Sequence, residues 1–297
     1  MIINHDKNPF SKKQLNNVIY DDYLKGFSLS LKKGERMNIV VCIKQVPGTT
    51  NVKVNPETGT LIRDGVASKM NPYDLNALEL ALNLVKENGG TLKVVSMGPP
   101  AALEVIREAI YMGADGGVLI SDRKFGGADV LATSYTLCSG IKAIGDYDII
   151  MCGKQTTDGD TAQVGAELAE HLGIPHVANV TRAKATDGKI KYVSNLGNKI
   201  VTAEVSTPCL ICTDSDINTP RLPSYKRKAE LKDCADLIKT ITFADVEDQD
   251  ETHYGLKGSA TQVERIFEPD KRKDKEIFTE GDLALKTYEI LKSKKFI

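Results

Sequence analysis

The chain has 297 residues, 41% of them hydrophobic, so it can form one large or two moderate domains with a buried core. Its formal net charge of -1 argues against a general role in binding nucleic acid or a membrane surface. No apolar run approaches the ~18 residues that a membrane helix needs, and the first residues lack the apolar core of a signal peptide, so we expect a cytoplasmic protein.

Residues 1–36 differ in character from the rest of the chain and are expected to form an N-terminal extension. They are polar and mildly basic, and they end in a charged run at 32–36. The aromatic side chains within this stretch suit contact with a partner protein as well as a free tail.

From Met37 the chain alternates between short apolar runs and helical patterns. The apolar runs predict buried strands, and Gly113 is a typical helix stop. Such alternation predicts a doubly wound α/β fold, with a mostly parallel sheet and helices on both faces. The loop after the first strand is expected to contain a small hairpin. The predicted strands are 38–44, 91–97, 117–121 and 146–152, and the predicted helices are 75–87, 99–112 and 127–144.

Residues 153–165 follow the fourth predicted strand and lead into a helix that begins near Val164. The loop offers backbone N–H, hydroxyl and amide groups, and a helix N-terminus carries about half a positive charge, so phosphate is a suitable ligand. Asp158 and Asp160 are unusual in a phosphate site, but aspartate is also a common N-cap. Two interpretations stay open here: a phosphate-binding loop and a capped helix start.

Other segments are expected beside this loop. In an open parallel sheet, ligands bind beyond the carboxyl ends of the strands, where the strand order reverses. If the first and fourth strands are neighbours, residues 42–45, 71–74 and 153–165 converge on one crevice, with Met97 at its rim. The alternative for Asn71-Pro72 is a simple turn, which is a common use of that dipeptide.

After residue 175 the pattern changes to alternating apolar and polar residues. Runs at 177–184, 189–195 and 199–205 predict an antiparallel excursion from the sheet. A buried strand follows at 208–213. The next loop, 214–223, is expected at the surface, although Ile217 and Leu222 with their polar neighbours also suit a loop that docks on a partner.

The tail from Ile238 contains little that can close a second core. Its apolar residues, such as Phe243 and Tyr254, are separated by polar segments, and only 281–292 has a helical pattern. An extended arm of this kind needs another surface to be stable, so we expect it to wrap around a partner subunit. The predicted domains are an extension at 1–36, a nucleotide-binding α/β domain at 37–235, and an arm with a terminal helix at 236–297.

Six cysteines lie mostly inside apolar runs, as expected for reduced and buried thiols. Cys209 and Cys212 form a C-x-x-C pattern, but residues three apart on a strand point to opposite faces, which favours a structural role. No second pair completes a four-ligand zinc set, and the four histidines are scattered. We therefore expect no metal site and no catalytic side chain.

Six motifs, taken in their order and spacing, resemble the β subunit of the electron-transfer flavoproteins over nearly the whole of 37–297. The resemblance implies a sheet of the adenine nucleotide alpha hydrolase-like type, an obligate complex with a larger α subunit, and a nucleotide in the crevice. Residues 1–36 depart from it, because most members of the family lack such an extension. The motifs are 40–44, 64–74, 95–99, 113–115, 153–165 and 217–221.

The resemblance also implies which nucleotide is bound. Ordinary members hold AMP in the crevice, whereas the electron-bifurcating branch holds a second FAD. In that branch the FAD is reduced by NADH and sends one electron to a ferredoxin and the other, through the α-subunit FAD, to a dehydrogenase. Residues 46–50, 58–64 and 159–165 resemble the bifurcating branch, which favours FAD over AMP. The sequence does not name the dehydrogenase, for which the resemblance leaves acyl-CoA, enoyl-CoA and 2-hydroxy-acid types open. A nucleotide-binding regulatory module without electron transfer stays as an alternative from another class.

Individual residues take roles from the same resemblance. Cys42 and Met97 are expected to present backbone to the adenine, and Lys44 or Arg63 can raise the flavin potential by stabilising anionic reduced flavin. Because the flavin carries the chemistry, the protein supplies binding and electrostatics. The implied partner-binding residues are Ile217, Asn218, Pro220 and Arg221. The implied cofactor-binding residues are Cys42, Asn71, Pro72, Tyr73, Asp74, Met97, Gln155, Asp158, Gly159, Asp160, Thr161, Ala162, Gln163, Val164 and Gly165.

Overall fold

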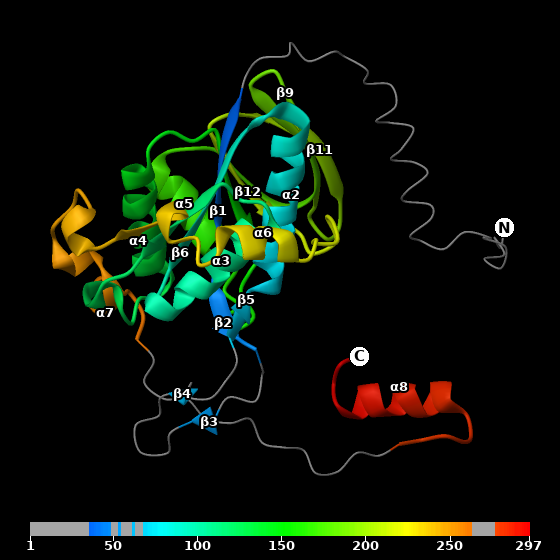
Figure 1. Ribbon diagram of the computed structural model, residues 1–297. Helices are drawn as coiled ribbons and strands as arrows, with labels where there is room; N and C mark the ends of the chain where they lie inside the picture. The colour runs from blue at the N-terminus through cyan, green and yellow to red at the C-terminus, as the bar shows by residue number, and fades with distance from the viewer. Residues whose placement is uncertain (1–35, 49–52, 55–60, 63–67, 263–276) are drawn as a thin grey trace. The chain divides into compact units, whose positions relative to one another are not determined.

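The computed structural model of the protein describes residues 36–48, 53–54, 61–62, 68–262 and 277–297 (Figure 1). These residues divide into two units, each described by itself below. The larger unit, called the body, contains 36–48 and 68–262, and the smaller contains 53–54, 61–62 and 277–297. The predicted extension, apart from Arg36, lies outside the described residues.

Most strands of the described body form one large sheet. They are β1 (Met37–Cys42), β6 (Gly90–Met97), β7 (Gly116–Ile120), β8 (Ile149–Gly153), β9 (His176–Thr186), β10 (Lys189–Asn195), β11 (Ile200–Ser206), β12 (Cys209–Thr213) and β13 (Ile238–Ile241). Among the described residues, the sheet has nine strands in the order β11-β10-β9-β12-β8-β1-β6-β7-β13. Every pair from β9 to β13 in this order is parallel, which confirms the predicted mostly parallel α/β fold. The first and fourth predicted strands, β1 and β8, are neighbours.

Helices of the body pack on the sheet in two hydrophobic clusters, because successive residues of a strand point to opposite faces. The helices are α2 (Pro72–Asn88), α3 (Leu103–Met112), α4 (Val130–Ile144), α5 (Val164–Leu172), α6 (Tyr225–Leu231) and α7 (Gly255–Gly258). Ile39 and Val41 of β1 belong to the cluster that contains residues of α2 and α3. Val40 and Cys42 belong to the cluster that contains residues of α4 and α5. The predicted two-sided packing is therefore present.

The C-x-x-C pattern follows the same rule. Cys209 lies in the first cluster and Cys212 in the second, on opposite faces of β12. All six cysteines are within the described part of the chain, where each is a free and buried thiol. The prediction of a structural role for this pattern fits these positions.

Antiparallel pairing occurs where apolar and polar residues alternate in the sequence. β10 runs antiparallel to both β9 and β11, which confirms the predicted excursion. The loop after β1 contains two further antiparallel pairs: β2 (Gln45–Pro47) with β5 (Ser68–Met70) in the body, and β3 (Lys53–Val54) with β4 (Leu61–Ile62) in the smaller unit. The hairpin expected in this loop is thus present in the described residues.

The tail from Ile238, expected to lie outside the α/β domain as an arm, instead begins as part of the body in the described residues. β13 extends the sheet beside β7, and the side chains of Phe243 and Tyr254 are only 6% and 1% exposed. Both rings pack with Phe125, at centroid distances of 6.2 and 5.4 Å. A four-residue strand and single anchors separated by polar residues have no recognisable period, so the sequence pattern did not show that they join the body. The described body therefore continues to residue 262, beyond the predicted boundary at 235.

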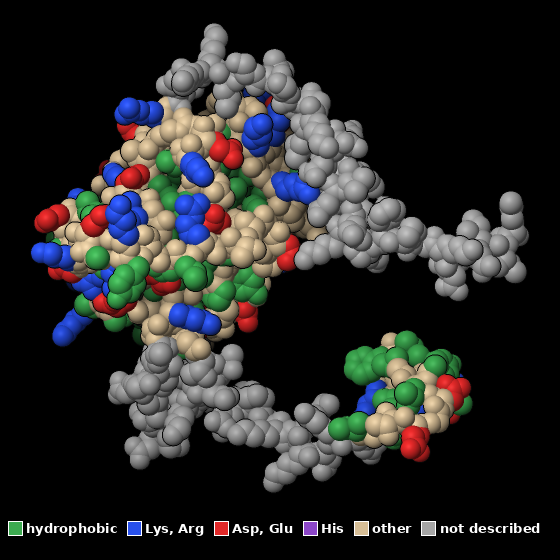
Figure 2. Space-filling model, turned by 45° about the vertical axis from the view of Figure 1, so that its right-hand side comes forward, with side chains coloured by type: hydrophobic (Ala, Val, Ile, Leu, Met, Phe, Trp, Pro, Cys, Tyr) green, Lys and Arg blue, Asp and Glu red, His purple; other side chains and the backbone are tan. Residues whose placement is uncertain are grey.

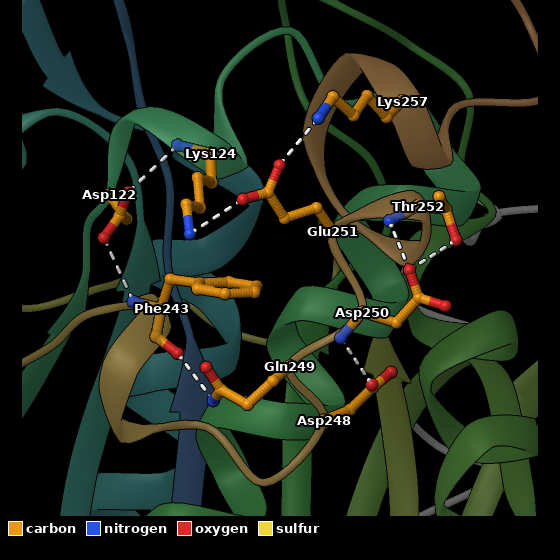
Figure 3. Close-up of polar contacts among 9 residues, drawn as sticks. All are labelled: Asp122, Lys124, Phe243, Asp248, Gln249, Asp250, Glu251, Thr252 and Lys257. Carbon is orange, nitrogen blue, oxygen red and sulfur yellow. Dashed lines mark hydrogen bonds and ion pairs between the residues drawn. The ribbon is translucent and has the colours of Figure 1, made fainter.

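Polar contacts join this C-terminal segment of the body to Asp122 and Lys124 and link its own turns to one another (Figure 3). Glu251 accepts ion pairs from Lys124, at 2.9 Å, and from Lys257, at 2.6 Å. The Lys124 ammonium also lies over the Phe243 ring, 3.9 Å from its centroid. Such exposed ion pairs contribute little individually, so the buried rings supply most of the stabilisation and the ion pairs orient the turns above them.

The smaller unit contains helix α8 (Leu283–Ser293), as the sequence predicted for 281–292. Asp282 caps it by accepting hydrogen bonds from the N–H groups of Ala284 and Leu285, at 3.1 and 3.0 Å. Much of its surface is hydrophobic in Figure 2, and Leu285 and Tyr288 are each about half exposed. An amphipathic helix with an uncovered apolar face is typical of a segment that packs on another chain. No described helix combines the length and the apolar character needed to span a bilayer.

Candidate functional site

The three segments that the sequence places at one crevice meet at the carboxyl ends of β1 and β8. Lys44 follows β1, and its carbonyl oxygen accepts a hydrogen bond from the N–H of Asn71, at 2.9 Å. Asn71 in turn contacts the loop that follows β8. This loop, residues 153–163, is called the β8–α5 loop below.

The side chain of Asn71 fixes the β8–α5 loop by hydrogen bonds. Its side chain is fully buried, its amide Nδ2 donates to the carbonyl oxygen of Gln155 at 2.8 Å, and its Oδ1 accepts from the N–H of Thr157 at 3.3 Å. Asn71 is also the residue before α2, and Pro72 occupies the first helical position, where proline is favoured. The Asn-Pro pair is therefore a helix start whose side chain fixes the loop, and not a simple turn.

Asp74 joins the ends of the two central strands. Its Oδ2 accepts from the N–H of Lys44 at 2.8 Å, and its carboxyl also accepts from the N–H of Gly153. A side chain at position 153 would collide with Asp74, because an added Cβ would lie 2.5 Å from its Oδ1. Burial raises the pKa of the Asp74 carboxyl to about 7, although hydrogen bonds from Asn71 and from the two backbone N–H groups oppose the rise.

The raised pKa makes stability depend on pH in a defined direction. Above the ordinary pKa of 3.8 the unfolded chain loses the Asp74 proton, whereas the folded body keeps it up to a pH of about 7. The folded state then binds more protons, so the free energy of unfolding should fall as pH rises through this window, by at most about 1.4 kcal/mol per pH unit. Urea unfolding of the wild type and of Asp74→Asn at several pH values measures this slope. The variant should lack the Asp74 part of it, and equal slopes in the two proteins would contradict the assignment.

The carboxylates of the β8–α5 loop do not cap helix α5. Asp158 accepts from the Lys44 ammonium, at 2.9 Å for each carboxylate oxygen, and Asp160 accepts from Gln155 Nε2 at 2.8 Å. Gln163 is the N-cap residue, and its side chain makes no capping hydrogen bond. The capped-start interpretation, in which an aspartate serves as the N-cap, was therefore wrong.

The N-terminus of α5 presents unpaired backbone donors. The first helical hydrogen bond runs from the N–H of Glu167 to the carbonyl oxygen of Gln163, at 3.1 Å. The N–H groups of 164–166 have no hydrogen-bond acceptor among the described residues, and such groups attract anions. Asp160 and Ala162 just before them have left-handed backbone, with φ of 51° and 56°. This conformation costs about 1–2 kcal/mol for a residue with a side chain, and alternating handedness turns successive N–H groups into an anion-binding concavity.

Gly165 allows α5 to sit directly on the sheet. The residue is buried, and a Cβ at this position would collide with the Sγ of Cys212 on β12. The helix end can therefore approach the carboxyl ends of the strands closely because position 165 has no side chain. The predicted residues 158–163 are exposed, Cys42 ends β1 as a buried residue, and Met97 ends β6 half-buried.

The loop predicted to bind a partner is held by α2. Asn218 donates to the carbonyl oxygen of Asn76 at 2.9 Å, and Arg221 forms a two-point ion pair with Glu79, at 2.7 and 2.9 Å. Ile217 packs against the first hydrophobic cluster. Most of the side chains predicted to face a partner are thus engaged within the body.

The exposed apolar side chains of this region lie just beyond those positions. Leu222 and Tyr225 are each 87% exposed, and the sequence pattern had pointed to Leu222 but not to Tyr225. A tyrosine next to the basic run 226–228 was the available signal. The pairing of Lys44 with Asp158 had no signal in the sequence, because the two residues are 114 positions apart.

Comparison with known proteins gives consistent matches. Residues 58–237 match the family model described as the electron transfer flavoprotein domain. The chain is 47% identical to an electron transfer flavoprotein subunit beta of Clostridium acetobutylicum, over 77% of this chain and 87% of that protein. It is 44% identical to the caffeyl-CoA reductase-Etf complex subunit CarD of Acetobacterium woodii, over 82% and 92%. Protein FixA of Azorhizobium caulinodans is 39% identical, over 80% and 87%.

Proposed function

Since this chain belongs to the electron transfer flavoprotein β-subunit family, we propose that it pairs with an α subunit and binds FAD in the crevice beyond the carboxyl ends of β1 and β8. When bound there, FAD would accept a hydride from NADH and pass one electron to a ferredoxin and the other, through the α-subunit FAD, to a flavin-dependent dehydrogenase. The complex would thus perform flavin-based electron bifurcation.

The observation that carries this proposal is the end of α5. Unpaired N–H groups at 164–166, two left-handed residues before them and a buried asparagine that holds the loop make a site that suits a phosphate group. The residues fit the diphosphate of FAD, and they equally fit the single phosphate of AMP. The protein would bind and orient the nucleotide, because the crevice residues form no nucleophile and base pair.

One further observation concerns the dehydrogenase partner, and another favours FAD and bifurcation. The similar protein CarD is named as a subunit of a complex with caffeyl-CoA reductase, which suggests a CoA-thioester enzyme as the dehydrogenase partner here. The sequence of 159–165 resembles the bifurcating branch. The other segments with that resemblance, 46–50 and 58–64, lie partly outside the described residues, as does Arg63.

The smaller unit supplies the proposed contact with the α subunit. Helix α8 exposes Leu283, Leu285 and Tyr288, and burying them on another chain would stabilise both the helix and the complex. We propose that this C-terminal part of the arm lies on the α subunit. A heterodimer in which α8 stays fully accessible to proteases would contradict this.

Counting the nucleotides of the purified heterodimer tests the function. The chain is produced together with its α subunit, the complex is denatured, and the released nucleotides are separated and quantified. We expect two FAD molecules per heterodimer and loss of the yellow colour when NADH is added without oxygen. One FAD and one AMP would instead support a member that binds AMP structurally. A colourless chain that does not pair with an α subunit would indicate a regulatory module.

A further inference from the structure

An ion pair joins the end of β1 to the β8–α5 loop. The Lys44 ammonium, just beyond β1, lies 2.9 Å from both carboxylate oxygens of Asp158 in the β8–α5 loop. The side chains are 45% and 22% exposed, respectively. A pair this exposed contributes about 0–1 kcal/mol to folding, so folding alone gives little reason for it.

The neighbouring charges show how the ion pair alters the net charge of the β8–α5 loop. The β8–α5 loop carries the carboxylates of Asp158 and Asp160 immediately before the N-terminus of α5. Its own cation, Lys154, is already engaged by Asp214 at 3.1 Å. Asp160 is held by the neutral amide of Gln155. With Lys44 in place, only Asp160 of these two carboxylates lacks a cationic partner among the described residues, whereas without Lys44 both would present negative charge to an anion approaching the helix end.

We propose that Lys44 is a positioning residue that neutralises Asp158, so that the β8–α5 loop can accept the phosphate of a nucleotide. This inference rests on the proposed function, since it deepens the description of the same site. The sequence led us to expect that Asp158 contacts the cofactor. Under this proposal Asp158 instead holds Lys44 and the loop. A like charge on the loop that receives an anion should weaken binding by roughly 10- to 100-fold at the effective dielectric near a protein surface.

The test uses the heterodimer, freed of the nucleotide in this crevice, and titration calorimetry with FAD and separately with AMP. Lys44→Met should weaken binding of either nucleotide by roughly 10- to 100-fold, and Lys44→Arg should bind as the wild type does. Lys44→Met combined with Asp158→Asn should recover most of the loss, because the uncompensated carboxylate is then gone. Lys93→Met is the matched control, since Lys93 is an exposed lysine in the interior of β6, and it should change nothing.

Salt separates neutralisation from a purely structural role. The deficit of Lys44→Met should shrink as ionic strength rises from ~0.05 to ~0.5 M, because the Debye length falls and screens the repulsion. A loss of affinity that does not depend on salt would overturn the proposal. So would wild-type affinity in Lys44→Met, or a double variant no better than Lys44→Met alone.

Nucleotide binding by the wild-type heterodimer distinguishes the proposed function from the role of Lys44. If the wild-type heterodimer binds neither FAD nor AMP in this crevice, the proposed function fails and takes this inference with it. If the wild type binds a nucleotide and Lys44→Met binds it equally well, the proposed function stands and the role of Lys44 is wrong.

Discussion

Replacing Asn71 with alanine should leave the heterodimer without the nucleotide of the β1–β8 crevice. The change removes the hydrogen bonds to Gln155 and Thr157 that hold the β8–α5 loop. It also leaves a backbone carbonyl oxygen and an N–H group without their partner, at about 1–3 kcal/mol each. Because the loop must then be ordered by the ligand itself, we expect nucleotide affinity to fall on the order of 100-fold or more. The measurement is the FAD content of the purified heterodimer, with thermal unfolding alongside.

Asn88→Ala is the matched control for this variant. Asn88 lies at the other end of α2, and its amide donates to the carbonyl oxygen of Leu84 at 2.8 Å, away from the crevice. It should retain the nucleotide. A full nucleotide content in Asn71→Ala would show that the loop keeps its shape without this side chain, which would contradict the positioning role.

Replacing Gly165 with alanine should also empty the crevice, and a second substitution should reverse the effect. The added Cβ would collide with the Sγ of Cys212, so the first turn of α5 must shift away from β12. Overpacking of this kind costs about 1–3 kcal/mol, and a displaced helix end no longer aims its N–H groups at a phosphate. We expect at least roughly a 100-fold loss of nucleotide affinity in the heterodimer, measured by calorimetry with FAD.

Gly165→Ala combined with Cys212→Ala should bind the nucleotide again. Without the sulfur, the other neighbours of the new Cβ are Leu210 Cδ2 at 3.5 Å and Cys152 Cβ at 3.6 Å, which are ordinary contacts. Alanine is also favoured over glycine within a helix by up to about 1 kcal/mol. Cys212→Ala alone controls for loss of the thiol and should retain the nucleotide. If the double variant stays empty, the cause is not the collision, and Gly165 must serve the ligand by another route.

Local patterns in the chain were sufficient for most of the fold. The apolar runs of β1 and β8 predicted buried strands, and the connecting helices predicted a parallel arrangement. They also placed the crevice beyond these two strands. The tail was misjudged because Phe243 and Tyr254 are held by contacts with α4 and Phe125, and no periodic pattern in their own segment reports such contacts.

Some features of the candidate site were also predictable from local sequence patterns, and others were visible only in the structure. The sequence located the β8–α5 loop and Asn71, because glycines and an Asn-Pro pair between periodic segments are local signals. It did not show that the Asn71 side chain faces the loop, that Lys44 meets Asp158, or that Leu222 and Tyr225 are exposed while Ile217 packs inward. These facts depend on which side chains the folded chain brings together.

Residue order was therefore enough for the succession of strands and helices and for the edge of the sheet where we propose the nucleotide site, because burial and helix or strand periodicity are properties of neighbouring residues. The contacts of Asp158, Asp74 and Gly165 were visible only in the folded body. Their partners lie on β8 and β12 or just beyond β1, far along the chain, and the packing of α2 and α5 on the sheet is what brings them within contact distance.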